Sequence, residues 1–168
     1  LVKFINLAAL IAIATLTACG FHLRGAQPLP FDSIHLGVSS YSDVGAELRR
    51  HIAANGKTVL KDKASDAQVS IQVLQETRNK TILSLNTQGQ VRDYQLQISF
   101  TFKLVDAAGN EVIPASNISV HRDLTYNDAQ VLAKEQEEIQ LYREMQNDIV
   151  QQLLRRLASA RWPLPATK

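Results

Sequence analysis

The stretch VRDYQLQISFTFKLV, residues 91–105, alternates apolar and polar side chains with a period of two. One parity carries the apolar residues Tyr94, Leu96, Ile98, Phe100, Phe102 and Leu104. The other parity carries Gln95, Gln97, Ser99, Thr101 and Lys103. Successive side chains of a β-strand point to opposite faces, so this stretch predicts a strand with one face on a core and the other in water. One-sided burial of this kind is typical of an antiparallel sheet.

Three other stretches predict further strands around this one. Residues 33–38 (SIHLGV) and residues 69–78 alternate in the same way, and a last strand carries Ile118, Val120 and Leu124. Arg122 falls on the apolar face of that last strand, and Pro114 interrupts the approach to it. The segment AAGNE, residues 107–111, predicts the turn that precedes it.

A first helix is predicted between the first two strands. Val44, Leu48 and Ile52 recur at steps of four and form one apolar stripe. Ser42 or Asp43 can cap the start, and Asn55-Gly56 supplies a stop after Ala54. A short apolar piece follows at residues 58–60.

A second, longer helix is predicted from Asn127 to about Ala160, with Gln130 as the capping-box partner of Asn127. Glu135, Glu137 and Glu138 near its start suit the positive end of a helix dipole. Its apolar stripe consists of Leu132, Ile139, Tyr142, Met145, Ile149, Leu153 and Leu157.

The order of these elements, β-α-β-β-β-α, defines the expected fold class. We predict an α+β fold in which two helices pack on one face of a small, mixed, mostly antiparallel four-stranded sheet. A chain of 168 residues suits one such domain, which we place at residues 33–162, followed by a tail at 163–168.

The first nineteen residues carry the pattern of a bacterial lipoprotein signal. Residues 4–18 are nearly all apolar, but this run of about 15 is short of the ~20 that a membrane-spanning helix needs. It ends in Leu-Thr-Ala-Cys, a lipobox whose cysteine, Cys19, is the only one in the chain. We therefore expect a signal peptide at 1–18, lipidation of Cys19 and a tether at 19–32; the alternative is a free cysteine that ends a hydrophobic helix. Gly20 after the cysteine favours the outer membrane over the inner one.

Composition and motifs argue against several classes of function. A net charge of +2 is too small to indicate a nucleic-acid-binding protein. One cysteine excludes an internal disulfide framework, and the four histidines lack metal-ligand spacing. No catalytic motif is present, so we predict neither an enzyme nor a bound cofactor or metal.

Basic residues near the middle of the chain predict a ligand surface instead. Arg78, Lys80 and Arg92 surround the loop before the long strand, and Lys134 opens the last helix. Lys103 adds a charge to the polar strand face. Arginine and lysine bind phosphate, so an amphiphile with a phosphorylated headgroup would suit them. The same charges also fit an ordinary solvated surface.

Three segments resemble the LptE family of lipopolysaccharide-assembly lipoproteins, also called rare lipoprotein B. They are CGFHLRG (residues 19–25), GQVRDYQL (89–96) and AQVLAKE (129–135). The resemblance implies a two-helix, four-stranded sandwich on the periplasmic side of the outer membrane, anchored by lipid. It also implies a one-to-one complex with the β-barrel LptD, which the lipoprotein plugs, and assistance in moving lipopolysaccharide to the outer leaflet.

The resemblance further implies which basic residues contact lipopolysaccharide. Lys134 matches the family's basic position early in the final helix. Arg92 lies at the end of the aligned loop, 87–92, shifted by a few positions from the family's basic residue. Two other functions are the alternatives. A stand-alone periplasmic lipid carrier needs a deep apolar pocket, whereas the alternating pattern predicts a filled core. A small periplasmic hydrolase needs titratable residues that converge in a cleft, and the sequence shows none.

Overall fold

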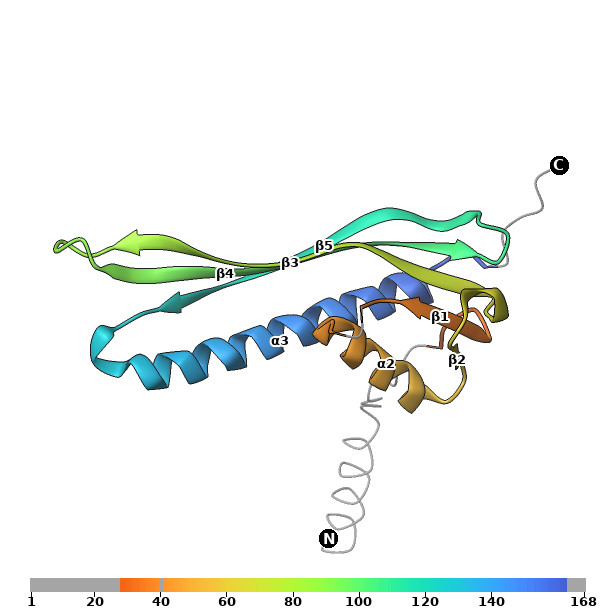
Figure 1. Cartoon of the computed structure of the whole chain (residues 1–168), viewed down its shortest axis with the longest axis horizontal. Helices are drawn as coiled ribbons and strands as arrows, with labels where there is room; N and C mark the ends of the chain where they lie inside the picture. Colours follow the sequence, from red (N-terminus) through yellow and green to blue (C-terminus); the bar gives the residue numbers. More distant parts are fainter. Residues whose placement is uncertain (1–27, 40, 163–168) are drawn as a thin grey trace, which may run out of the picture.

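The computed structural model describes residues 28–39 and 41–162 (Figure 1). The predicted signal peptide at 1–18, Cys19, most of the tether and the tail at 163–168 lie outside the described residues. Within the described part of the chain, no helix is both long enough and apolar enough to cross a membrane.

Residues 28–39 and 41–162 form one sheet and two α-helices, which confirms the predicted α+β class. The strands are β1 (Ser33–Gly37), β2 (Val59–Lys61), β3 (Val69–Leu85), β4 (Val91–Asp106) and β5 (Glu111–Thr125), in the spatial order β2-β1-β3-β4-β5. β1 is parallel to β2 and β3, whereas β3, β4 and β5 form an antiparallel meander. The helices α2 (Asp43–Asn55) and α3 (Val131–Ala158) lie on the same side of the sheet (Figure 1). The described residues also contain two 3₁₀ turns, Ala64–Asp66 and Asp128–Gln130.

The sheet has five strands where the sequence predicted four. The additional strand, β2, is the short apolar piece at residues 58–60, displaced by one residue. It pairs with the outer edge of β1, and the preceding Thr58 hydroxyl donates to the Phe31 carbonyl oxygen at 3.1 Å. Three residues are too few to establish a periodicity, so only the pairing with β1 identifies this strand.

The caps predicted for the first helix are present. The Ser42 hydroxyl oxygen accepts a hydrogen bond from the Gly45 amide at 2.9 Å, which satisfies one of the unpaired amides of the first turn. After the last turn, Gly56 adopts a φ of 67°, a left-handed conformation that glycine reaches without strain. Val44, Leu48 and Ile52 are all buried, as their spacing predicted.

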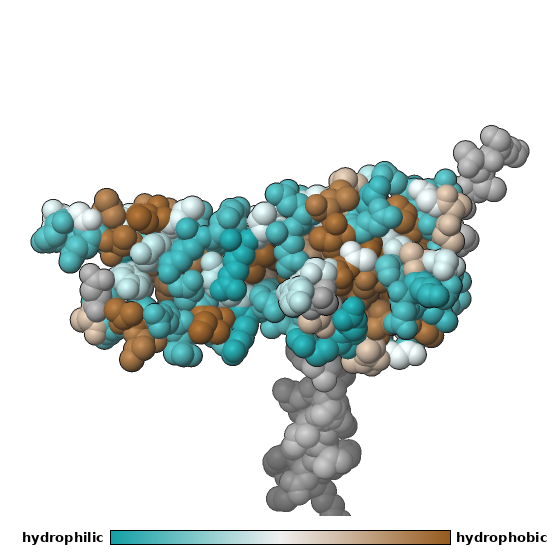
Figure 2. All heavy atoms as spheres, in the orientation of Figure 1, coloured by the Kyte–Doolittle hydropathy of each residue, from teal (hydrophilic) through white to brown (hydrophobic). Residues whose placement is uncertain are grey.

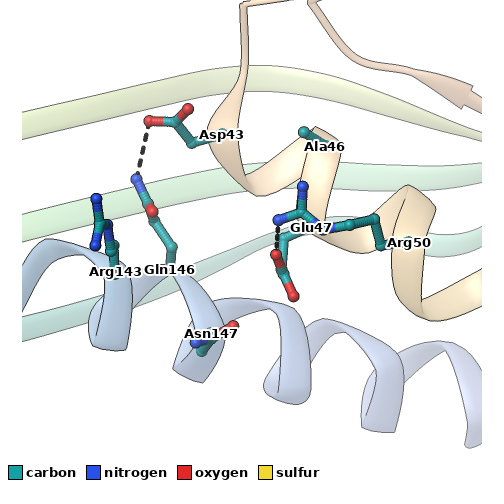
Figure 3. A pocket seen from close by; sticks show the side chains of 7 residues that line it. All are labelled: Asp43, Ala46, Glu47, Arg50, Arg143, Gln146 and Asn147. Atoms are coloured by element: carbon teal, nitrogen blue, oxygen red, sulfur yellow. Dashed lines mark hydrogen bonds and ion pairs between the residues drawn. The ribbon is translucent and has the colours of Figure 1, made fainter. Parts of the chain in front are cut away.

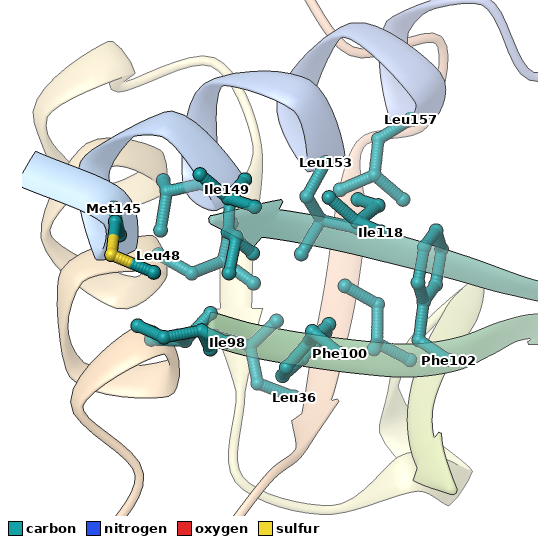
Figure 4. Packing of buried hydrophobic residues seen from close by; sticks show 14 of the residues in the cluster. Leu36, Leu48, Ile98, Phe100, Phe102, Ile118, Met145, Ile149, Leu153 and Leu157 are labelled. Atoms are coloured by element: carbon teal, nitrogen blue, oxygen red, sulfur yellow. The ribbon is translucent and has the colours of Figure 1, made fainter. Parts of the chain in front are cut away.

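The core lies between α2, the second half of α3 and the inner face of the sheet (Figure 4). Every apolar residue of the long alternating strand from Leu96 to Leu104 is buried there, so the face assigned from the sequence is confirmed. On α3 the buried residues are Tyr142, Met145, Ile149, Val150, Leu153 and Leu157. The predicted stripe is wrong at its start, because Leu132 is 79% exposed and Ile139 is 41% exposed.

A bulge in β3 explains why the core stops halfway along α3. The register with β4 shifts between Val73 and Gln75, so the inward-facing positions change from odd to even numbers. Beyond the bulge, the inner face of β3 therefore carries Glu76, Arg78 and Lys80. In this part of the sheet β3 therefore presents charged side chains to α3, beside the buried Leu96 and Leu124 of β4 and β5. The strand also runs further than predicted, to Leu85 instead of residue 78.

The last strand is likewise longer than predicted, since β5 continues through Pro114. It lies at the edge of the sheet, where a residue without an amide hydrogen is tolerated. Arg122 on its inner face forms an ion pair with Asp148 of α3, which gives this charge on an apolar strand face a partner.

Candidate functional site

The end of the molecule that contains the β3–β4 turn gathers most of the predicted ligand residues. We call it the distal end; it comprises the β3–β4 turn (residues 86–90), the strand ends beside it, and the first turns of α3 (left in Figure 1). The turn is closed by a 2.8 Å backbone hydrogen bond from the Asn86 amide to the Gln90 carbonyl oxygen. The Asn86 side chain also accepts from the amides of Gln88 and Gln90, both at 2.9 Å. These bonds satisfy polar groups of the turn within the turn itself.

Two cations of β3, Arg78 and Lys80, face α3. Lys80 donates to a carboxylate oxygen of Glu138 at 2.6 Å, and its Nζ lies 4.3 Å from the centre of the Tyr94 ring. The Arg78 guanidinium lies 3.3 Å from the centre of the Tyr142 ring, and the Tyr142 hydroxyl donates to the Asn79 carbonyl oxygen at 3.2 Å. The first half of α3 is thus attached to the sheet by charged and polar contacts.

The environment of Lys80 keeps this side chain protonated. Burial lowers its pKa, but the hydrogen bond and charge of Glu138 outweigh that effect, so the pKa lies above the ordinary value of 10.5. Lys80 is therefore a permanent cation at physiological pH.

The two basic residues singled out by the sequence both lie at the distal end. Lys134 is only 16% exposed and contacts Glu137 of the same helix at 2.7 Å. Arg92 is 71% exposed, and its Nε lies 3.6 Å from the Asp93 carboxylate. The Ser84 hydroxyl donates to that carboxylate at 2.6 Å and lowers the pKa of Asp93 below its ordinary value. Arg92 is accordingly the most accessible of these cations, and Lys134 the most enclosed.

Lys103, the third predicted ligand residue, is not brought to this site. It lies eleven residues along β4 from Arg92, a distance of about 36 Å at ~3.3 Å per residue. Its Nζ is 3.6 Å from the carboxylate of Glu111. Cys19, the predicted lipidation site, lies outside the described residues.

The sequence did not indicate which carboxylates contact the distal cations. The sequence placed Glu137 and Glu138 at the start of a helix, where they suit its dipole. Only the structure brings Glu138 to Lys80, which is 58 residues away in the chain. Each of Lys80, Lys134 and Arg92 therefore has a carboxylate beside it that an incoming anion could replace.

The outer face of the sheet is polar, and its side chains form hydrogen bonds with one another. Gln97 donates to the Ser119 hydroxyl oxygen at 3.1 Å, and the Asn117 amide contacts the hydroxyl oxygens of Ser99 and Thr101, both at 2.8 Å. These side chains come from β4 and β5 and carry no charge. The face therefore presents amide and hydroxyl groups to water or to a hydrated partner.

A polar pocket of about 310 Å³ lies between α2 and α3 (Figure 3). Gln146 donates to Asp43 across it at 3.0 Å, and Glu47 pairs with Arg50 along one wall. Ala46 is the only apolar residue among those that line it. This lining does not suit a hydrocarbon chain. Among the described residues, no three His, Cys, Asp or Glu side chains are grouped so that they could hold a metal ion.

Comparison with known proteins places this architecture in a family. The model of the LptE family, described as lipopolysaccharide-assembly, matches residues 31–157. The LPS-assembly lipoprotein LptE of Photorhabdus laumondii is 27% identical over 150 residues, which cover 88% of this chain and 81% of the relative. The corresponding protein of Pectobacterium atrosepticum is 25% identical over 150 residues and is covered to 80%.

Solved structures agree with this assignment. The solution structure of lipoprotein B from Nitrosomonas europaea superposes with a TM-score of 0.73 at 36% identity, covering 83% of this chain and 91% of that one. A minor lipoprotein from Acinetobacter baumannii gives a TM-score of 0.64 at 26% identity, with 79% and 94% covered. Because the family model spans most of the sequence and the fold matches, this chain belongs to the LptE lipopolysaccharide-assembly family.

Proposed function

We propose that this protein binds lipopolysaccharide through the distal cations while it occupies the lumen of the outer-membrane β-barrel LptD. Cys19 would carry the lipid that attaches it to the periplasmic side of the outer membrane. The observation that carries the proposal is the grouping of Lys80, Arg92 and Lys134 at one end, each beside a carboxylate.

The chemistry of these pairs suits the exchange of one anion for another. A carboxylate carries one charge, whereas a phosphate group carries up to two and offers three acceptor oxygens. Lipid phosphates could therefore displace Glu137, Glu138 and Asp93 from the cations that they now contact. Arg92 would make the first contact because it is the most exposed, and Lys134 and Lys80 would follow.

This exchange suggests how the protein assists assembly. Divalent metal ions bridge the phosphates of neighbouring lipopolysaccharide molecules in an aggregate. Protein cations that compete for the same phosphates would loosen single molecules from the aggregate as they pass through the barrel.

The outer face of the sheet supports the placement in a barrel. A barrel lumen is polar, so a plug needs a hydrophilic exterior and a core of its own. The amide and hydroxyl groups of β4 and β5 supply that exterior, and the buried cluster beneath them supplies the core.

Charge reversal at the distal end tests lipopolysaccharide binding. Replacing Arg92→Asp together with Lys134→Asp should weaken binding to immobilised lipopolysaccharide at least tenfold, with an unchanged circular dichroism spectrum. The matched control is Lys57→Asp with Lys63→Asp, which makes the same charge change at exposed sites away from the distal end. Lys103→Asp, measured separately, tests whether that residue contributes. Equal binding by the distal variant and the control would refute the role of the distal cations.

Purification of the lipidated protein from outer membranes tests the partner. We expect a large β-barrel to co-purify at one to one, and mass spectrometry to find a fatty-acylated Cys19. Recovery of the protein alone with bound lipid would instead support the stand-alone carrier.

A further inference from the structure

Exposed apolar side chains gather at the same end as the cations. The exposed fractions are 58% for Ile82, 51% for Leu83, 55% for Leu85, 38% for Val131 and 79% for Leu132. The first three lie at the end of β3, and the other two begin α3. In Figure 2 hydrophobic atoms appear at this end both on the strand hairpin and on the start of the helix, with hydrophilic atoms between them.

The Lys80–Glu138 pair shows how the two groups of apolar residues are related. It joins β3 to α3 at 2.6 Å, which fixes one point of contact between the two elements. From that point Ile82 lies about 7 Å further along the strand towards the turn. Val131 lies about 10 Å from Glu138 towards the start of the helix. Both groups therefore lie between the Lys80–Glu138 pair and the tip of the distal end.

Two of the apolar residues, Ile82 and Val131, share a face with a cation. Ile82 stands opposite Tyr94 on the inner face of the sheet, two residues from Lys80. On α3 the spacing of Val131, Lys134 and Glu138 places all three on one side of the helix. The distal end is consequently amphipathic: apolar side chains form a margin nearest its tip, and the cations Lys80 and Lys134 lie next to them, further from the tip.

We propose that this margin, formed by Ile82, Leu83, Leu85, Val131 and Leu132, binds the acyl chains of the lipid whose phosphates contact the distal cations. The inference rests on the proposed function and assigns a second subsite to it. An anionic lipid carries a charged headgroup and apolar chains in one molecule, so a site for it needs cations and apolar surface within a short distance. The distal end offers that combination: Lys80 lies two strand positions from Ile82, and Lys134 lies one helical turn from Val131.

Charge complementarity favours a lipid over a protein segment as the occupant. The margin is aliphatic, and the cations Lys80 and Lys134 beside it have carboxylate partners that a phosphate can displace. A hydrocarbon chain makes no hydrogen bonds and needs only apolar contact, whereas a protein segment would also have to satisfy its own backbone groups.

The test compares intact lipopolysaccharide with its O-deacylated form, both dispersed in the same detergent. Deacylation removes ester-linked chains and leaves the phosphates. We expect the full-length protein to bind the intact form at least tenfold more tightly. In the variant Ile82→Ser, Leu85→Ser, Leu132→Ser this preference should fall below threefold, while affinity for the deacylated form stays the same. The control variant is Tyr41→Ser, Val59→Ser, Leu74→Ser, which changes equally exposed apolar residues elsewhere and should keep the preference.

Three outcomes would overturn the inference. One is a distal variant that keeps the full preference for the acylated form. Another is an equal loss of affinity for both forms. The third is normal lipid binding with loss of the co-purifying barrel, which would make the margin a protein contact. Failure of the unmodified protein to bind either form would instead refute the proposed function itself.

Discussion

Removing the charge of Glu138 should lower stability and strengthen ligand binding at the same time. In Glu138→Gln the side chain keeps its shape but no longer neutralises Lys80, from which it lies 2.6 Å away. The two side chains are 21% and 34% exposed, so solvent screens much of their attraction. Pairs of this kind contribute about 0.2–1 kcal/mol to stability. We therefore expect the free energy of unfolding to fall by about 0.5–1 kcal/mol, or roughly 1–4 °C in Tm.

The same free energy sets the expected gain in binding. Under the proposed function, a phosphate must displace Glu138 from Lys80 in the unmodified protein, and in the variant it need not. A contribution of about 0.5–1 kcal/mol corresponds to a two- to fivefold tighter Kd for lipopolysaccharide. Urea denaturation measures the stability, and titration with lipopolysaccharide measures the affinity.

Lys80→Gln provides the matched comparison. It breaks the same ion pair, so its loss of stability should be similar, but it removes the cation and should weaken binding. The double variant completes a cycle that isolates the energy of the pair. If Glu138→Gln weakens binding as much as Lys80→Gln, the pair serves only to hold α3 on the sheet, and the reasoning about exchange is refuted.

Three further predictions concern the scaffold. Met145→Ala should cost about 2–5 kcal/mol in urea denaturation, because the side chain is fully buried; a cost below 1 kcal/mol would contradict the placed core. Gly45→Ala should cost about 1–3 kcal/mol, because the added Cβ would lie 2.6 Å from a methyl group of Val38, and Val38→Ala in the same chain should recover most of that loss. The pKa of Asp93 is lowered by the Ser84 hydroxyl, so its contribution to stability is present above its unfolded pKa and is lost as pH falls through the folded value. Ser84→Ala should therefore make the urea midpoint less sensitive to pH below about 4, and an unchanged pH dependence would count against this role.

The sequence alone determined the local elements. Alternation over residues 91–105 fixed a long strand and its buried face, because each side chain's direction in a strand follows from its parity. The Ser42 and Gly56 signals fixed the ends of the first helix, because caps act on backbone groups within a few residues. Element order then sufficed for the fold class, and two of the three predicted ligand residues do lie at one end of the molecule.

Only the tertiary structure decided which parts of these elements are covered. The bulge at Leu74 reverses the parity of β3, so Arg78 and Lys80 turn towards α3 and end the core halfway along that helix. The helical period of α3 could not predict where its burial ends. It indicates which residues share a face of the helix but not which residues of the sheet pack against that face. Pairing between residues far apart in the chain also created β2 and joined Lys80 to Glu138. The amphipathic distal end results from these non-local contacts, which no local pattern specifies.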